Sequence, residues 1–163
     1  MRTSLKLSLA LAAALGITST AQAQTSQVIN ATATVLSAIT ITGTDLAFGN
    51  IAPTQTKTIA PAAGGTFVVT GSANSAVTVS LTTLPTNINS AALALGSWTG
   101  LHGQSNLPAS GAAFVPSTSF STAATLSATG LYHMWIGATL TATAATPGSY
   151  TSATPITIQV VYN

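Results

Sequence analysis

The strongest constraint on the fold of this chain is an alternation of apolar and polar residues with a period of two. Between residues 29 and 42 every odd position except Ser37 is apolar, and threonine or asparagine fills most of the even ones. Successive side chains of a β-strand point to opposite faces, so the pattern predicts a strand with one apolar face. The run is long for a single strand, and we expect it to bend near Ser37 or to serve two roles. Its apolar positions are Ile29, Ala31, Ala33, Val35, Ile39 and Ile41.

Similar runs recur along the chain and predict a fold built from strands. Helical periodicity is hard to find after residue 24, because Thr, Ser, Val and Ile dominate the regular stretches and favour pleated surfaces. About seven to nine short strands without a helix predict an all-β fold, a β-sandwich whose two sheets pack face to face. The pattern weakens in the glycine-rich stretch 85–116, where we expect loops, with His102 in one of them. Strands are expected at 56–60, 67–69, 77–81, 131–142 and 156–162, with short ones near 91–95 and 112–115.

The beginning of the chain has the pattern of a secretory signal peptide. Arg2 and Lys6 precede an apolar run over residues 7–17, and Ala21-Gln22-Ala23 follows as an A-x-A cleavage site. We therefore expect a signal peptide over 1–23 and a single mature domain over 24–163. The apolar run is too short to span a bilayer, and no later stretch is long enough, so no transmembrane segment is expected after cleavage.

Charged side chains are almost absent from residues 24–163, where only Asp45 and Lys57 carry a formal charge. Binding to nucleic acid needs several Lys or Arg to neutralise phosphates, so this class of partner is not expected. With no net charge, copies of the domain lack mutual repulsion, which favours assembly over dispersal. The chain has no cysteine, so its stability must come from packing and hydrogen bonds alone.

The chemistry of an enzyme is also missing from the sequence. A single carboxylate cannot provide a catalytic pair, and no Gly-x-Ser-x-Gly motif accompanies the two histidines. His102 and His133 lack the Cys or acidic partners of a metal site, and we expect His133 to point outward beside Trp135. The prediction is a protein that is not an enzyme and has no metal or cofactor.

Aromatic side chains are the remaining candidates for ligand contacts. Trp98 and Trp135 offer faces on which sugars stack if they are exposed, and Tyr132 and Tyr150 could assist them. The alternative is that both tryptophans are core or subunit-contact residues, as is common in small sandwiches.

Several short motifs in a fixed order carry a family resemblance. They are the alternating N-terminal run, Leu46-Ala47-Phe48-Gly49-Asn50-Ile51, Thr66-Phe67-Val68-Val69-Thr70-Gly71, Pro147-Gly148-Ser149-Tyr150 and the alternating run 156–163. The chain resembles a family of secreted bacterial β-sandwich domains of uncharacterised function. It is also similar to pilins of the archaic chaperone–usher pathway and to spore-coat-U-like domains.

The resemblance implies an immunoglobulin-like sandwich that lacks its last strand and receives the N-terminal strand of the next subunit. Residues 24–35 would then be the donor strand, with Ile29, Ala31, Ala33 and Val35 as its inserted side chains. Ile156, Ile158, Val160 and Tyr162 would border the acceptor groove, and a tyrosine at the position of Tyr162 matches pilin C-termini. Many such pilins carry a disulfide, which this chain cannot form.

Strand exchange also has a physical basis in the residues themselves. Soluble monomers protect their edge strands with Lys, Glu, Pro or bulges, and neither terminal run of this chain contains a charge. An uncharged strand with apolar residues at every second position is suited to adding to an exposed edge. The same pattern also fits a strand that pairs within its own subunit, and the sequence leaves both possibilities open.

These observations lead to two functional hypotheses. The first is a structural subunit of an extracellular filament, pilus or surface layer that polymerises by strand complementation and serves adhesion or biofilm formation. Its partners would be copies of itself or related subunits, with a periplasmic chaperone and outer-membrane usher as further candidates, and its location the bacterial surface after passage through the periplasm. The second is a self-contained secreted module that binds carbohydrate or other surface material.

Overall fold

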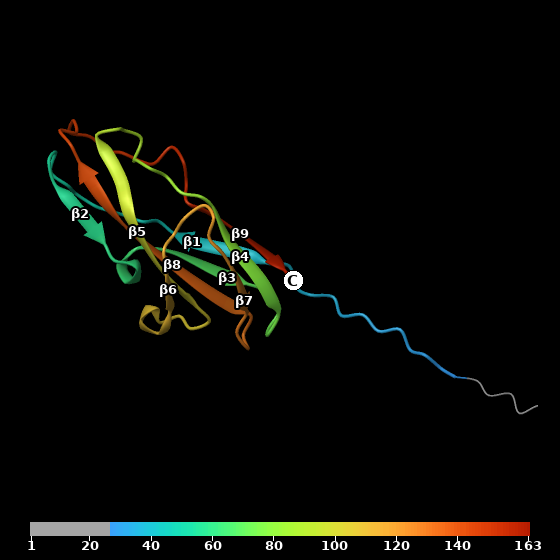
Figure 1. Ribbon diagram of the computed structural model, residues 1–163. Helices are drawn as coiled ribbons and strands as arrows, with labels where there is room; N and C mark the ends of the chain where they lie inside the picture. The colour runs from blue at the N-terminus through green and yellow to red at the C-terminus, as the bar shows by residue number, and fades with distance from the viewer. Residues whose placement is uncertain (1–26) are drawn as a thin grey trace, which may run out of the picture. The chain divides into compact units, whose positions relative to one another are not determined.

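The computed structural model describes residues 27–163, so the predicted signal peptide over 1–23 lies outside the described residues. The chain separates into one unit of Met1–Thr34 and another of Val35–Asn163. In the first unit, residues 27–34 have no regular secondary structure and are exposed to solvent. The second unit contains the nine strands of the described chain and two short 3-10 helices (Figure 1).

The larger sheet is centred on β8 (Leu131–Ala142), the longest strand of the described chain. One edge of β8 pairs first with β3 (Gly65–Thr70) and then with β2 (Thr56–Ile59), and its other edge pairs with β5 (Leu93–Gly103). The outer strands of this sheet are β1 (Thr40–Thr44) beside β3, and β6 (Ala112–Phe114) beside β5. All pairings are antiparallel.

The smaller sheet has three antiparallel strands in the order β7-β4-β9. Its centre is β4 (Ala76–Thr83), flanked by β7 (Ser121–Thr125) and β9 (Thr157–Tyr162). Among the described residues, β9 and β7 each pair with β4 alone, so both are edge strands.

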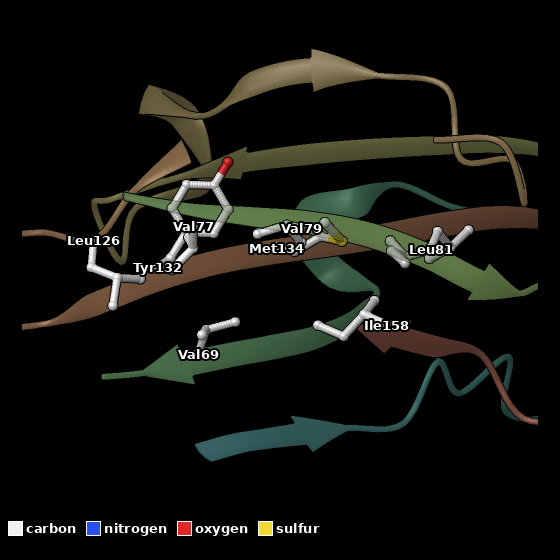
Figure 2. Close-up of a cluster of buried hydrophobic side chains, with 9 residues drawn as sticks. Val69, Val77, Val79, Leu81, Leu126, Tyr132, Met134 and Ile158 are labelled. Carbon is white, nitrogen blue, oxygen red and sulfur yellow. The ribbon is translucent and has the colours of Figure 1, made fainter. Parts of the chain in front are cut away.

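The two sheets pack face to face and bury one apolar cluster between them. Val69, Tyr132, Met134 and Ile136 come from the larger sheet, and Val77, Val79, Leu81 and Ile158 from the smaller one; Leu126 completes the set. Figure 2 shows these side chains gathered between the strands. All of them are at most 8% exposed. This layered packing of two antiparallel sheets is that of a β-sandwich, as the alternating pattern predicts.

The three-stranded sheet covers only part of the face that β8 presents to the core. The first half of that face belongs to the cluster just described, whereas Ala138, Leu140 and Ala142 belong to a second cluster with Phe48 and Leu93. The side chains packed around this second cluster come mainly from loops, including Leu46, Ile51, Ile88 and Ala145. The sandwich therefore has a strand-covered half and a loop-covered half.

Most of the strands expected from alternation are present in the structure. The strands expected at 56–60, 67–69, 77–81, 112–115, 131–142 and 156–162 correspond to β2, β3, β4, β6, β8 and β9. The sequence did not predict β7, because its Ser-Thr-Ala-Ala-Thr stretch lacks large apolar residues.

The expectation of loops around a short strand at 91–95 is wrong, since β5 extends over Leu93–Gly103. The register of β5 against β8 shifts between Gly96 and Thr99, and Ser97 takes a left-handed φ of 47°. Before this bulge the odd positions face the core, as Leu95 does opposite Leu140; after it the even positions do, as Gly100 does opposite Ile136. The bulge therefore reverses the alternation, and a search for apolar residues at every second position does not detect the strand.

The placement of His102 in a loop is wrong for the same reason. His102 lies on β5 opposite Met134 and faces the interior, where its Nδ1 and the Tyr132 hydroxyl share a hydrogen bond. Its ring lies 5.5 Å from that of Phe114 and 5.9 Å from that of Phe120. Burial lowers the pKa of His102 and raises the pKa of Tyr132 to about 12, so both groups are uncharged at neutral pH.

The expected long strand over 29–42 is much shorter in the structure. Only Thr40–Thr44 form a strand, because these are the residues that pair with β3. Residues 27–39 have no regular secondary structure.

Candidate strand-docking groove

The free side of β9 is one border of the candidate site. The backbone N–H of Asn163 donates to the carbonyl of Ala76 on β4 at 3.1 Å. In antiparallel pairs the residues alternate between bonding to the neighbour and pointing away from it, so the N–H and C=O groups of Ile158, Val160 and Tyr162 point to the free side. No strand of the described chain pairs with β9 on that side.

The side chains of β9 alternate between solvent and core. Ile158 is buried, and Ile156, Val160 and Tyr162 are partly buried against the same cluster. The four residues that the resemblance assigns to the acceptor groove therefore all pack toward the core, three from β9 and Ile156 from the residue just before it.

The edge of the larger sheet forms the second border. Ile41 of β1 lies opposite Val69 of β3 and so shares its core-facing side. Val69 is completely buried, yet Ile41 remains 40% exposed. The core-facing Ile41 is thus only partly covered at the sheet edge. We use the name groove for the candidate acceptor site, which consists of Ile41 on β1 and of Ile156, Ile158, Val160 and Tyr162 along the free side of β9.

Tyr162 closes one end of the groove with hydrogen bonds to two other segments. Its hydroxyl donates to the carbonyl of Ser37 at 2.8 Å and accepts from the backbone N–H of Ser72 at 2.7 Å. The N–H of Ser37 also donates to Oγ of Ser72 at 2.6 Å. Gly71 leaves room for the phenol, since a Cβ there would lie 2.5 Å from the hydroxyl oxygen. We call Ser37, Ser72 and Tyr162 the tyrosine clamp.

A cavity of about 1020 Å³ lies at the other end of the groove, beside Ile156. Its walls are the last two residues of β1, the loop residues 45–53 and parts of 145–156, which replace the smaller sheet over the second half of β8. Phe67, Trp98 and Leu140 contribute apolar surface from β3, β5 and β8. Ile156 therefore belongs both to the cavity lining and to the groove residues.

The charges near the cavity are few. Asp45 is part of its lining, and Nζ of Lys57 donates to the carbonyl of Asn50 at 3.5 Å, which ties the cavity loop to β2. Within residues 27–163 no group of three or more His, Cys, Asp or Glu side chains is placed to hold a metal ion. Over the same range, no helix has the length and apolar character needed to cross a membrane.

The predicted donor side chains are exposed in the structure. Ile29 is 88% and Val35 95% exposed, and Ala31 and Ala33 are exposed as well. Their role as donors to another subunit remains a prediction.

The two tryptophans occupy different environments. Trp98 follows the β5 bulge, lines the cavity and packs against both core clusters. Trp135 is only 5% exposed on the outer side of β8, where it stacks on His133 with a centroid distance of 5.7 Å and an interplanar angle of 12°. Gly137 lies on the same side, and a Cβ there would be 2.3 Å from the carbonyl oxygen of Ile59, so the chain passes directly over it. Trp135 consequently has no free face for a sugar, and of the two only Trp98 reaches the cavity.

Two residues of the site are not marked as functional by the sequence pattern. The pattern places Phe67 on a strand and Ile41 on the apolar face of another, without a functional role for either. The available signal for Ile41 is its position in the first strand of the described chain, because a first strand often lies at a sheet edge.

Comparison with known proteins gives no relative of this chain: no protein-family model, no curated protein and no solved structure matches it.

Proposed function

We propose that this protein is a structural subunit of an extracellular filament, pilus or surface layer, and that it assembles by inserting its N-terminal segment into the groove of another copy. The observation that carries the proposal is that β9 has an unpaired edge while Ile41, a core-facing side chain on the edge strand β1, stays partly exposed. A strand inserted there would cover Ile41 and bond to the free backbone groups of β9.

The N-terminal segment has the properties that the groove requires. Its apolar residues recur at every second position and it has no charge, so one face can enter the groove without burying an unpaired ion. Ala31 and Ala33 are small, which suits the middle of the groove, where Ile158 is already buried.

The finer assignments follow from the same proposal. The domain would be an immunoglobulin-like sandwich completed by an exchanged strand, related to archaic chaperone–usher pilins and spore-coat-U-like domains. It would be exported through its signal peptide, pass through the periplasm with a chaperone and usher as candidate partners, and act at the cell surface in adhesion or biofilm formation. Its role would be structural and not catalytic.

Charge substitutions within the donor segment test the proposal. In the double variant Ala31→Asp/Ala33→Asp the carboxylates would enter the groove, and assemblies should be lost in sedimentation velocity experiments. The matched control Thr32→Asp/Thr34→Asp adds the same charge to the opposite face and should still assemble. Assembly of Ala31→Asp/Ala33→Asp at the wild-type level would contradict the proposal.

A second candidate function is supported by the cavity. Trp98 and Tyr150 both line it, together with polar side chains such as Asn50 and Ser149, and this combination suits a sugar. A binding module of this kind would be a stable monomer. In the variant Trp135→Phe the remaining tryptophan fluorescence reports on Trp98; a saturable shift with a polysaccharide and a monomeric state in sedimentation would favour this candidate over the filament subunit.

A further inference from the structure

The cavity has an apolar floor, which is the core-facing side of the larger sheet. Phe67 of β3, Trp98 of β5 and Leu140 of β8 all line it. The floor follows β8 from Ile136 to Ala142, a distance of about 20 Å at the rise of an antiparallel strand. Protein interiors are close-packed and leave few voids larger than a water molecule. A space of about 1020 Å³ on such a floor therefore points to an occupant.

The lining of the cavity changes from apolar to polar between the floor and the solvent. Every large apolar or aromatic side chain of the lining is buried or partly buried, from Phe48 and Leu93 to Trp98 and Tyr150. The hydroxyl and amide side chains lie on the loops at the outer edge, which we call the rim. Those of the rim that are exposed to solvent are Asn50, Thr146, Ser149, Thr151 and Thr154.

The floor offers a ligand no hydrogen bonds. Among residues 27–163 no polar or charged side chain is buried, and the backbone groups of β8 are engaged by strands on both of its edges. A hydroxyl group brought onto the floor would lose its water without gaining a partner, which is unfavourable. A ligand that fills the cavity must therefore be apolar where it meets the floor and polar only where it meets the rim.

The charges at the rim favour a ligand whose polar end is uncharged. Asp45 lies in the lining, and the ammonium of Lys57 is bonded to the carbonyl of Asn50 on the same loop. These two are the only formally charged side chains of residues 27–163, and they have opposite signs. The rim thus has no excess charge with which to bind an anionic or a cationic head group.

We propose that the cavity binds one unbranched alkyl or acyl chain whose uncharged, hydroxyl-bearing head stays at the rim, as in alkyl glycosides and monoacylglycerols. The proposal rests on the binding role given above as the second candidate function, and it makes the sugar the head group of an amphiphile. The chain lies along β8 on the floor, and the head meets Tyr150 and the hydroxyl side chains of the rim. Pockets of this size with apolar walls and a few polar groups are typical of small-molecule sites.

A series of alkyl maltosides, used below their critical micelle concentrations, tests the proposal. In the mature chain carrying Trp135→Phe, Trp98 is the remaining tryptophan, and entry of the chain should shift its fluorescence to the blue in a saturable manner. Burial of one methylene group corresponds to about a fourfold gain in affinity. Dodecyl maltoside should therefore bind about fifteenfold more tightly than decyl maltoside, and maltose alone should give no shift.

A variant that fills the cavity locates the bound chain. Ala145 is partly buried in the lining, and Ala145→Phe should weaken the binding of dodecyl maltoside at least about tenfold, a loss comparable to two methylene groups. Ala113 is exposed on β6 outside the lining, so the matched control Ala113→Phe should leave the affinity unchanged. Urea denaturation checks that both variants fold, and the alkyl series on the parent chain needs neither of them.

Four results would overturn the proposal. Equal binding of maltose and dodecyl maltoside would exclude the alkyl chain but leave a sugar site of the second candidate in place. An unchanged affinity in a folded Ala145→Phe variant would place the chain outside the cavity, and tighter binding of dodecanoate than of dodecyl maltoside would contradict an uncharged head. Binding of dodecyl maltoside only to the chain lacking residues 24–35 would assign the cavity to that segment instead.

Absence of binding by every alkyl maltoside would overturn the proposal as well. The polysaccharide titration described above then decides the second candidate function separately.

Discussion

The hydroxyl of Tyr162 donates a hydrogen bond of 2.8 Å to the backbone carbonyl of Ser37, which joins the last strand to the point where the N-terminal segment leaves the domain. The same oxygen accepts the N–H of Ser72 at 2.7 Å. One side chain thus holds together β9, the turn after β3 and the base of the proposed donor strand. This contact determines where the residues before Ser37 leave the sandwich.

Removal of the Tyr162 hydroxyl should destabilise the domain. In Tyr162→Phe the partly buried N–H of Ser72 loses its partner, and the expected loss in free energy of unfolding is about 1–3 kcal/mol. Tyr150→Phe is the control, because the Tyr150 hydroxyl donates to the exposed carbonyl of Thr146 at 2.8 Å and its loss should cost less than about 1 kcal/mol. Urea denaturation measures both, and equal midpoints for the two variants would argue against the clamp.

Gly71 should be sensitive to the addition of a single methyl group. A Cβ at this position would lie 2.5 Å from the Tyr162 hydroxyl and 2.9 Å from Cδ1 of Leu126, so Gly71→Ala forces the phenol out of the clamp. We expect a loss of about 1–3 kcal/mol, as for other overpacked sites. In Gly96→Ala the new methyl group meets nothing within 4 Å, and the stability should change by less than about 1 kcal/mol. Thermal unfolding of Gly71→Ala and Gly96→Ala measures both effects. An unfolding temperature of Gly71→Ala equal to that of the wild type would contradict the packing around Tyr162.

The strand-covered half of the core should respond strongly to a cavity. Leu126 is completely buried within the first cluster, and Leu126→Ala should lower the free energy of unfolding by about 2–5 kcal/mol. Leu107 is 63% exposed, so Leu107→Ala should change it by no more than about 0.5 kcal/mol. Urea denaturation measures the free energy of unfolding of both variants. Similar losses for Leu126→Ala and Leu107→Ala would contradict the burial of Leu126 in the core.

Acidification should destabilise the fold through its two histidines. Burial lowers the pKa of both His102 and His133 below the ordinary 6.5, so below that pH the unfolded chain takes up protons that the folded chain resists. Stability is therefore fully present above pH 6.5 and declines as the pH falls toward the lowered values. Unfolding midpoints measured between about pH 7 and about pH 5, a range above the ordinary carboxyl pKa, should fall for wild type.

The variant His102→Gln/His133→Gln should show a flatter profile over the same range, and each single variant should lie between the two. An unchanged slope in the double variant would mean that other groups cause the acid sensitivity.

The strands that sequence alternation predicts correctly are those that keep one parity over the predicted residues. β8 and β9 keep one parity from end to end, so Met134, Ile136 and Ile158 are recognisable as core residues from the sequence alone. Where the parity changes, prediction fails. The bulge at Ser97 moves the core-facing positions from odd to even, and nothing in a local pattern reveals that Trp98 and His102 turn inward.

The groove was only partly predictable for a related reason. The alternation of β9 places Ile156 and Tyr162 on one face, but exposure of that face depends on which strand lies beside it in space. The partial exposure of Ile41 at a sheet edge and the cavity beside Trp98 depend on the arrangement of the two sheets, a property of the whole fold that no single segment encodes.

In the proposed function, residues 24–35 join one copy of this protein to the next. The most direct test compares the purified mature chain with the chain lacking residues 24–35. Both are measured by sedimentation velocity, and the same samples are viewed by electron microscopy. Strand donation predicts multimers or filaments for the mature chain and only single subunits for the truncated one. Multimers of the truncated chain equal in size and amount to those of the mature chain would contradict it.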